Sequence, residues 1–132
     1  MNELKIFVVD DDVFYLNLFK QQLFIIGYDD VKQFNDGKQC LLQLNEKPDV
    51  IFVDFNMESI SGSELIAQIK LINPSIFIVM ISSQSNTKPS YEALKLGAFD
   101  FILKDNFVEE KLTEILSNIN SIKNFNKMKN NL

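Results

Sequence analysis

The chain has 132 residues, of which 46% are hydrophobic and 23% are charged, and this length and composition are typical of one globular domain. A formal net charge of −5 argues against a nucleic-acid-binding surface, which needs clustered lysine and arginine. Because the sequence has no histidine, it lacks the usual catalytic base and the commonest zinc ligand. Carboxylates are therefore the main groups available for chemistry.

The sequence also predicts a cytoplasmic protein without a membrane segment. Its longest apolar run, at positions 76–81, is far shorter than the roughly 20 residues that a transmembrane helix needs. Acidic residues follow the start of the chain too closely for a secretion signal. Cys40 is the only cysteine, so no disulfide can form within the chain, and we interpret it as a small apolar helix residue.

Five short apolar runs are predicted to be strands. They cover residues 4–9, 29–34, 49–55, 75–82 and 98–104. The first, third and fourth are nearly continuous in isoleucine, valine and phenylalanine, as expected for strands buried on both faces of a parallel sheet.

Helical periodicity fills the segments between these strands. Residues predicted to share one helical face are Leu16, Phe19, Leu23 and Ile26; Leu65, Ile69 and Ile72; and Val108, Leu112, Ile115, Leu116, Ile119 and Ile122. Gly27 and Gly97 follow predicted helices, and Pro89 suits the first turn of another. The repeated alternation predicts an α/β domain with a parallel sheet and right-handed crossovers.

Acidic residues end two of the predicted strands. Asp10 and Asp11 end the first and Asp54 ends the third, whereas Asp12 fits an N-cap of the following helix. The carboxyl ends of parallel strands form the edge where ligands bind. Like charges about 4 Å apart repel by roughly 1 kcal/mol in water and about 4 kcal/mol in a less polar setting. If strands one and three are neighbours, as we expect, Mg²⁺ would relieve this repulsion.

Four motifs at this edge resemble the receiver domain of two-component response regulators, such as the bacterial chemotaxis regulator. They are "VVDD" at 8–11, "VDFNM" at 53–57, "ISS" at 81–83 and "ILK" at 102–104. The resemblance extends from about residue 4 to residue 116. It implies a flavodoxin-like (βα)5 doubly wound α/β sandwich with a five-stranded parallel sheet in the order 2-1-3-4-5. We expect residues 1–124 to form the receiver domain and residues 125–132 to form a tail or the start of a linker.

The resemblance also implies roles in phosphoryl transfer. Asp54 corresponds to the phosphoacceptor, and Lys104 and Ser82 correspond to residues that contact the phosphoryl group. Ser82 and Phe101 correspond to the pair that changes position on phosphorylation, although a strand phenylalanine is as often a plain core residue.

The same resemblance implies Mg²⁺ as the cofactor. Asp11 and Asp54 would bind the ion directly, together with the main-chain carbonyl of Asn56, and Asp10 would act through water. The phosphoryl donor would be a histidine kinase or a phosphotransfer protein. A downstream protein would bind the surface of helix four, strand five and helix five, and a homodimer is left open. We expect no direct contact with nucleic acid or membrane, and no enzymatic turnover of a separate substrate.

Three positions depart from the family pattern. Glu58 replaces a usual proline and Ser61 a common acid, which we expect to alter loop stiffness rather than chemistry. Asp105 replaces a proline that follows a cis bond, and a cis bond before a non-proline residue costs about 2.5–4 kcal/mol. We therefore predict a trans Lys104–Asp105 bond, and an Asp105 carboxylate that draws the Lys104 ammonium away from the phosphate site when no Mg²⁺ is bound.

Three other functions compete with this interpretation. A pseudo-receiver would keep the fold and bind partners without phosphate. A flavodoxin-like cofactor binder would need a loop after strand one that accepts a phosphate, and the aspartates there would repel it. A haloacid-dehalogenase-type phosphatase with Asp54 as nucleophile would need a second acid where this chain has Asn56.

Overall fold

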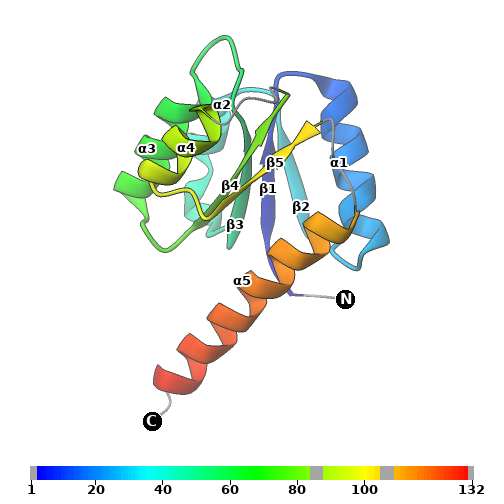
Figure 1. Ribbon diagram of the computed structural model, residues 1–132, viewed down its shortest axis with the longest axis vertical. Helices are drawn as coiled ribbons and strands as arrows, with labels where there is room; N and C mark the ends of the chain where they lie inside the picture. The colour runs from blue at the N-terminus through cyan, green and yellow to red at the C-terminus, as the bar shows by residue number, and fades with distance from the viewer. Residues whose placement is uncertain (1–2, 84–87, 105–108, 131–132) are drawn as a thin grey trace.

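The structure is a computed structural model that describes residues 3–83, 88–104 and 109–130. Its elements follow the chain as β1 (Ile6–Val9), α1 (Val13–Ile25), β2 (Val31–Phe34), α2 (Gly37–Leu42), the 3-10 helix η1 (Leu44–Glu46), β3 (Val50–Asp54), α3 (Gly62–Ile72), β4 (Phe77–Ser82), α4 (Lys88–Lys95), β5 (Asp100–Leu103) and α5 (Glu109–Asn130). The strands form one parallel five-stranded sheet in the order β2-β1-β3-β4-β5 (Figure 1). The predicted fold class and strand order are confirmed.

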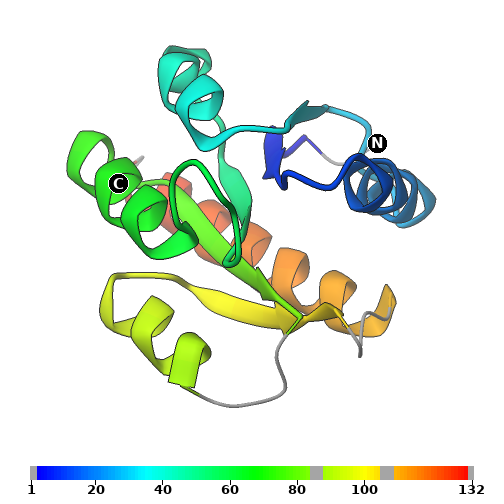
Figure 2. The same cartoon turned by 90° about the horizontal axis from the view of Figure 1, so that it is seen from above.

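The sheet lies between two layers of helices. Helices α1 and α5 cover one face, and α2, α3 and α4 cover the other (Figures 1 and 2). Alternate residues of β3 face the two helical layers. Val50 and Phe52 pack with the buried residues of α1 and α5. Ile51 and Val53 pack with those of α2, α3 and α4. Burial on both faces explains why the central strands are continuously apolar.

Capping residues and glycines mark the ends of several helices at the predicted positions. The Asp12 side chain accepts a hydrogen bond from the Phe14 N–H and so caps α1. Gly27 has a φ of 101° and Gly97 a φ of 106°, a left-handed conformation that glycine adopts without strain. Ser61, which we expected only to change loop stiffness, caps α3 by accepting a hydrogen bond from the Glu64 N–H at 3.2 Å.

Two residues assigned to buried helical faces are instead exposed. Ile72 is 60% exposed at the end of α3, and Ile122 is 37% exposed on α5. Helix α5 runs past position 124, where we placed the domain boundary, and continues to Asn130 as a projection from the body (Figure 1). The periodicity marked the correct helices, but both residues lie past the last buried residues of these helices, Ile69 and Ile119. Val108 lies outside the described residues.

The interpretation of Cys40 agrees with the structure. Cys40 is fully buried in α2, as expected of a small apolar residue, and burial raises the pKa of its thiol to about 12. No helix within residues 3–83, 88–104 and 109–130 has the length and apolar character needed to cross a membrane.

Gly62 allows α3 to approach the end of β3 closely. A Cβ atom at this position would lie 2.6 Å from the Phe55 Cα and 2.8 Å from the Asp54 carbonyl oxygen. The Gly62 N–H also donates a hydrogen bond to the Phe55 carbonyl at 3.1 Å. Glycine at this position therefore sets the path of the loop that follows Asp54.

We expect Gly62→Ala to lower the free energy of unfolding by about 1–3 kcal/mol, because the added methyl group meets backbone atoms that cannot turn aside. Urea denaturation followed by circular dichroism would measure the change. Ser63→Ala, in the same helical turn, is the control and should change stability by less than about 0.5 kcal/mol. Equal stability of Gly62→Ala and the wild type would show that the close approach is not required.

Candidate functional site

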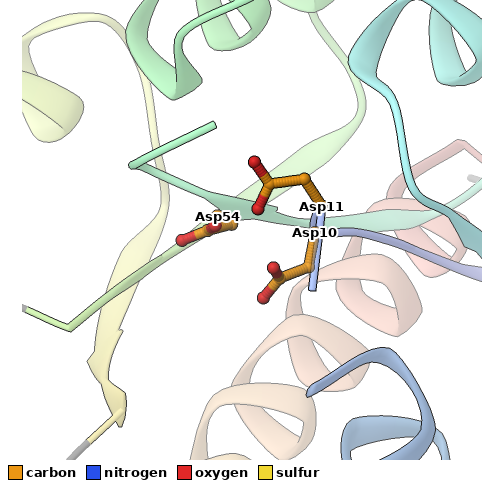
Figure 3. Close-up of side chains that lie close together, drawn as sticks. All are labelled: Asp10, Asp11 and Asp54. Atoms are coloured by element: carbon orange, nitrogen blue, oxygen red, sulfur yellow. The ribbon is translucent and has the colours of Figure 1, made fainter. Parts of the chain in front are cut away.

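The carboxyl ends of β1 and β3 bring three carboxylates together. The two strands are parallel neighbours, and Val9 is paired with Val53 in the residues directly before Asp10 and Asp54. One oxygen from each of Asp10, Asp11 and Asp54 lies within 4.8 Å of the others. Figure 3 shows the three side chains converging at this edge. The prediction that strands one and three are neighbours is confirmed.

Backbone groups orient each carboxylate. The Asp12 N–H donates to Asp10 Oδ1 at 2.9 Å. The Glu58 N–H donates to Asp11 Oδ2 at 3.3 Å, and the Asn56 N–H donates to Asp54 Oδ1 at 3.4 Å. Because these donors belong to the loops after β1 and β3, the same loops that end the strands also hold the acids in place.

The three acids differ in their access to water. Asp10 is 2% exposed and Asp54 is 3% exposed, whereas Asp11 is exposed. Buried carboxylates lose hydration and need compensating charge or hydrogen bonds. Asp11 therefore lies at the mouth of the site, with Asp10 and Asp54 beneath it.

Lys104 follows β5 and brings an ammonium group to the buried acids. Its Nζ lies 3.0 Å from Asp10 Oδ2 and 3.6 Å from Asp54 Oδ1, and its side chain is 8% exposed. The hypothesis that Lys104 is drawn away from the site is wrong, because two buried carboxylates hold the ammonium there. The Lys104–Asp105 bond and Asp105 itself lie outside the described residues.

The site is short of positive charge. Burial, followed by the neighbouring charge of Asp10, raises the pKa of Asp54 to about 6, although Lys104 and the Asn56 N–H partly oppose this. Burial alone would lower the pKa of Lys104, but its hydrogen bond to Asp10 and the charges of Asp54 and Asp10 outweigh that effect and raise it. Among the residues that the structure describes, one ammonium, that of Lys104, lies within 4.0 Å of these carboxylates, and it pairs with two of the three.

The other residues predicted for the site lie at different distances along the strands from this edge of the sheet. Ser82 ends β4, is 1% exposed and is paired in register with Leu103, the residue before Lys104. The exposed Asn56 follows β3 by two residues, and its side-chain amide donates to Ser83 Oγ at 3.4 Å. Phe101 lies farther back on β5, where it is partly buried against the core beneath α2, α3 and α4.

Sequence reasoning missed Tyr15. The centroid of its ring lies 4.0 Å from Lys104 Nζ, so the ring covers the ammonium from the side of α1. A signal was present, because Tyr15 precedes the buried Phe19 by one helical turn and follows the acidic strand end closely. We had assigned no role to it.

The donor set fits a hard divalent cation. Carboxylate oxygens are the ligands that Mg²⁺ prefers, and it commonly takes one or two of them beside water. Two buried carboxylates and one exposed carboxylate, with a deficit of positive charge, match this preference. The same charge would repel the phosphate of a flavin.

Compared with known proteins, the chain matches receiver domains. A sequence model described as the response regulator receiver domain matches residues 6–117. The transcriptional regulatory protein ZraR of Escherichia coli is 33% identical over 104 residues, which are 78% of this chain and 23% of ZraR. The chain thus spans about a quarter of the ZraR proteins that it matches.

Relatives of similar length also match. The chemotaxis protein CheY of Listeria monocytogenes is 31% identical over 114 residues, which are 86% of this chain and 95% of CheY. The crystal structure of the receiver domain of NtrX from Brucella abortus superposes with a TM-score of 0.80 at 29% identity, covering 87% of this chain and 97% of that domain. The chain therefore belongs to the response regulator receiver domain family of two-component systems.

Proposed function

We propose that this receiver domain is a phosphorylation switch in which Asp54 accepts a phosphoryl group from a phosphohistidine. The donor would be a histidine kinase or a phosphotransfer protein in the cytoplasm. The observation that carries this proposal is the position of the Asp54 carboxylate, which is buried at the sheet edge between one ammonium and two further carboxylates. Phosphoryl transfer depends mainly on aligning the attacking oxygen with phosphorus and on neutralising the charge of the phosphoryl oxygens. A fixed carboxylate beside an ammonium suits both requirements.

Mg²⁺ is the cofactor that this proposal requires. Asp11 and Asp54 would hold it directly with the main-chain carbonyl of Asn56, and Asp10 would act through water. When bound, the ion supplies positive charge that offsets the repulsion among the carboxylates and neutralises phosphoryl oxygens. The deficit of positive charge around Asp54 supports this assignment.

The chain's own groups would carry out the transfer. An Asp54 carboxylate oxygen attacks phosphorus, the P–N bond of the phosphohistidine breaks, and the imidazole leaves with the bonding electron pair. Lys104, already 3.6 Å from Asp54, pairs with a phosphoryl oxygen. The Ser82 hydroxyl donates a hydrogen bond to another. No substrate is turned over apart from the phosphoryl group, which the domain receives and later releases.

The added group would change the surface of the domain. A phosphoryl group adds about −1.5 to −2 charges, which would attract Lys104 and Ser82. The pair that would change position is Ser82 and Phe101, which lie on the neighbouring strands β4 and β5. A downstream protein would recognise the altered surface of α4, β5 and α5.

We expect the wild type to gain one phosphate-sized mass when it is incubated with Mg²⁺ and acetyl phosphate, because this small donor replaces the phosphohistidine. Asp54→Asn should show no gain, and the wild type in EDTA should show little. Intact-mass spectrometry would measure all three.

Asp36→Asn is the matched control, since it makes the same chemical change at the N-cap of α2 and should keep the mass gain. A gain that survives Asp54→Asn would refute the assignment of the acceptor. If the wild type gains no mass, the domain behaves as a pseudo-receiver instead.

Asp54→Asn should also stabilise the metal-free domain. The folded-state pKa of Asp54, about 6, is higher than its ordinary value of 3.8, so its ionised form destabilises the fold. This penalty is fully present above about pH 6 and disappears as the pH falls toward about 4, where the unfolded chain is protonated as well. We expect the variant to be more stable by about 2–3 kcal/mol at about pH 7 in EDTA.

Urea denaturation across this pH range would test the prediction, and the difference between variant and wild type should shrink steadily toward acid pH. Asp36→Asn again serves as the control, because asparagine caps a helix as well as aspartate does. A difference that is independent of pH would contradict the electrostatic explanation.

A further inference from the structure

We propose that the ring of Tyr15 positions the Lys104 ammonium for its contact with the phosphoryl group on Asp54. This inference rests on the proposed function and adds a residue to it. Tyr15 lies in the first turn of α1, five residues after Asp10, the first acid of the "DDD" run that follows β1. Its role is to hold Lys104, and it touches no reacting atom itself.

The geometry around Lys104 leaves one side of the ammonium to the ring. Asp10 and Asp54 approach Nζ at 3.0 Å and 3.6 Å, and the centroid of the Tyr15 ring lies 4.0 Å away. A cation within about 6 Å of an aromatic centroid is attracted by the negative face of the ring, more strongly where water is excluded. The Lys104 side chain is 8% exposed, so the contact lies in such a place.

The surroundings of the ring are mostly apolar. Tyr15, Lys104 and the buried Asp10 line a cavity of about 10 Å³ whose other walls are Val8, Leu18, Phe19 and Ile81. This volume is at the lower limit of what a water molecule needs. Because the Lys104 side chain is 8% exposed, its ammonium meets the ring face and the carboxylates rather than bulk water.

A ring differs from a carboxylate in how it holds the ammonium. A carboxylate binds through directed hydrogen bonds, whereas an aromatic face attracts a cation over a broad area. Lys104 can therefore turn from Asp10 toward a phosphoryl oxygen without leaving the ring. Tyr15 keeps the charge inside the site while its hydrogen-bond partner changes.

A purely space-filling role for Tyr15 makes a different prediction. If the ring only covers the apolar cavity, leucine would serve in its place, and any loss would be one of stability alone. Phe24 offers a control, because it is an aromatic residue near the other end of the same helix and is 59% exposed. Phe14 is unsuitable, since its ring lies edge-on to that of Tyr15 with the centroids 5.9 Å apart. No cation–π contact of Phe24 is found among the described residues.

Beryllium trifluoride, which mimics an aspartyl phosphate, provides the test in the presence of Mg²⁺. We expect Tyr15→Leu to weaken its binding by about 2- to 30-fold, the range that a cation–π contact implies. Tyr15→Phe keeps the aromatic face and should stay within about twofold of the wild type, as should Phe24→Leu. Mg²⁺ affinity is measured separately for each variant, so that beryllium trifluoride binding is compared at equal saturation with the metal. Unfolding curves of each variant would confirm that it is folded.

An NMR measurement tests the contact without phosphate chemistry. In the wild type and Tyr15→Phe, the Lys104 side-chain protons next to Nζ should be shifted upfield by the ring, and Tyr15→Leu should abolish the shift. Unshifted protons in the wild type, or full beryllium trifluoride affinity in Tyr15→Leu, would overturn the proposal. If the wild type fails to bind beryllium trifluoride, the proposed function fails, whereas the upfield shift still decides whether the ring holds Lys104.

Discussion

The repulsion among Asp10, Asp11 and Asp54 is the constraint on which the site depends. Their oxygens lie within 4.8 Å of one another, and unit charges at about 4 Å repel by roughly 4 kcal/mol at intermediate dielectric. The acids cannot separate, because β1 and β3 are paired in register along β1 and are buried on both faces. Packing of the central strands thus holds together charges that would otherwise move apart, and leaves the edge ready for a cation.

The loops after the strands complete this arrangement. Each carboxylate accepts a hydrogen bond from a backbone N–H a few residues away or across the site. Gly62 brings the start of α3 against the residues that follow Asp54, which fixes the path of that loop. The rigid parts of the fold therefore determine where the acids lie, and among the described residues the long, flexible side chain that reaches them is that of Lys104.

Much of the fold and of the site could be predicted, because a charged residue follows the apolar run of several strands and marks where each strand ends. Asp10, Asp54 and Lys104 mark three strand ends in the sequence, and parallel topology then places them at one edge. Periodicity could not show where burial along a helix stops, which is why Ile72 and Ile122 were placed in the core although they are exposed past the last buried residues of α3 and α5. Tyr15 escaped notice because an aromatic residue beside a helix's apolar face resembles core, and only the folded chain brings it to Lys104.

Lys104 connects the chemistry of the site with the rest of the domain. Among the groups that the structure describes here, the carboxylates are held by backbone donors, whereas the ammonium is hydrogen-bonded to Asp10 at 3.0 Å and lies 3.6 Å from Asp54. Charge added at Asp54 would therefore be answered first by Lys104, because its long side chain can turn at low cost. Lys104 directly follows β5, the edge strand that carries Phe101 and packs beside α4 and α5. A local change of charge thus has a short path to the surface that we assign to partner binding.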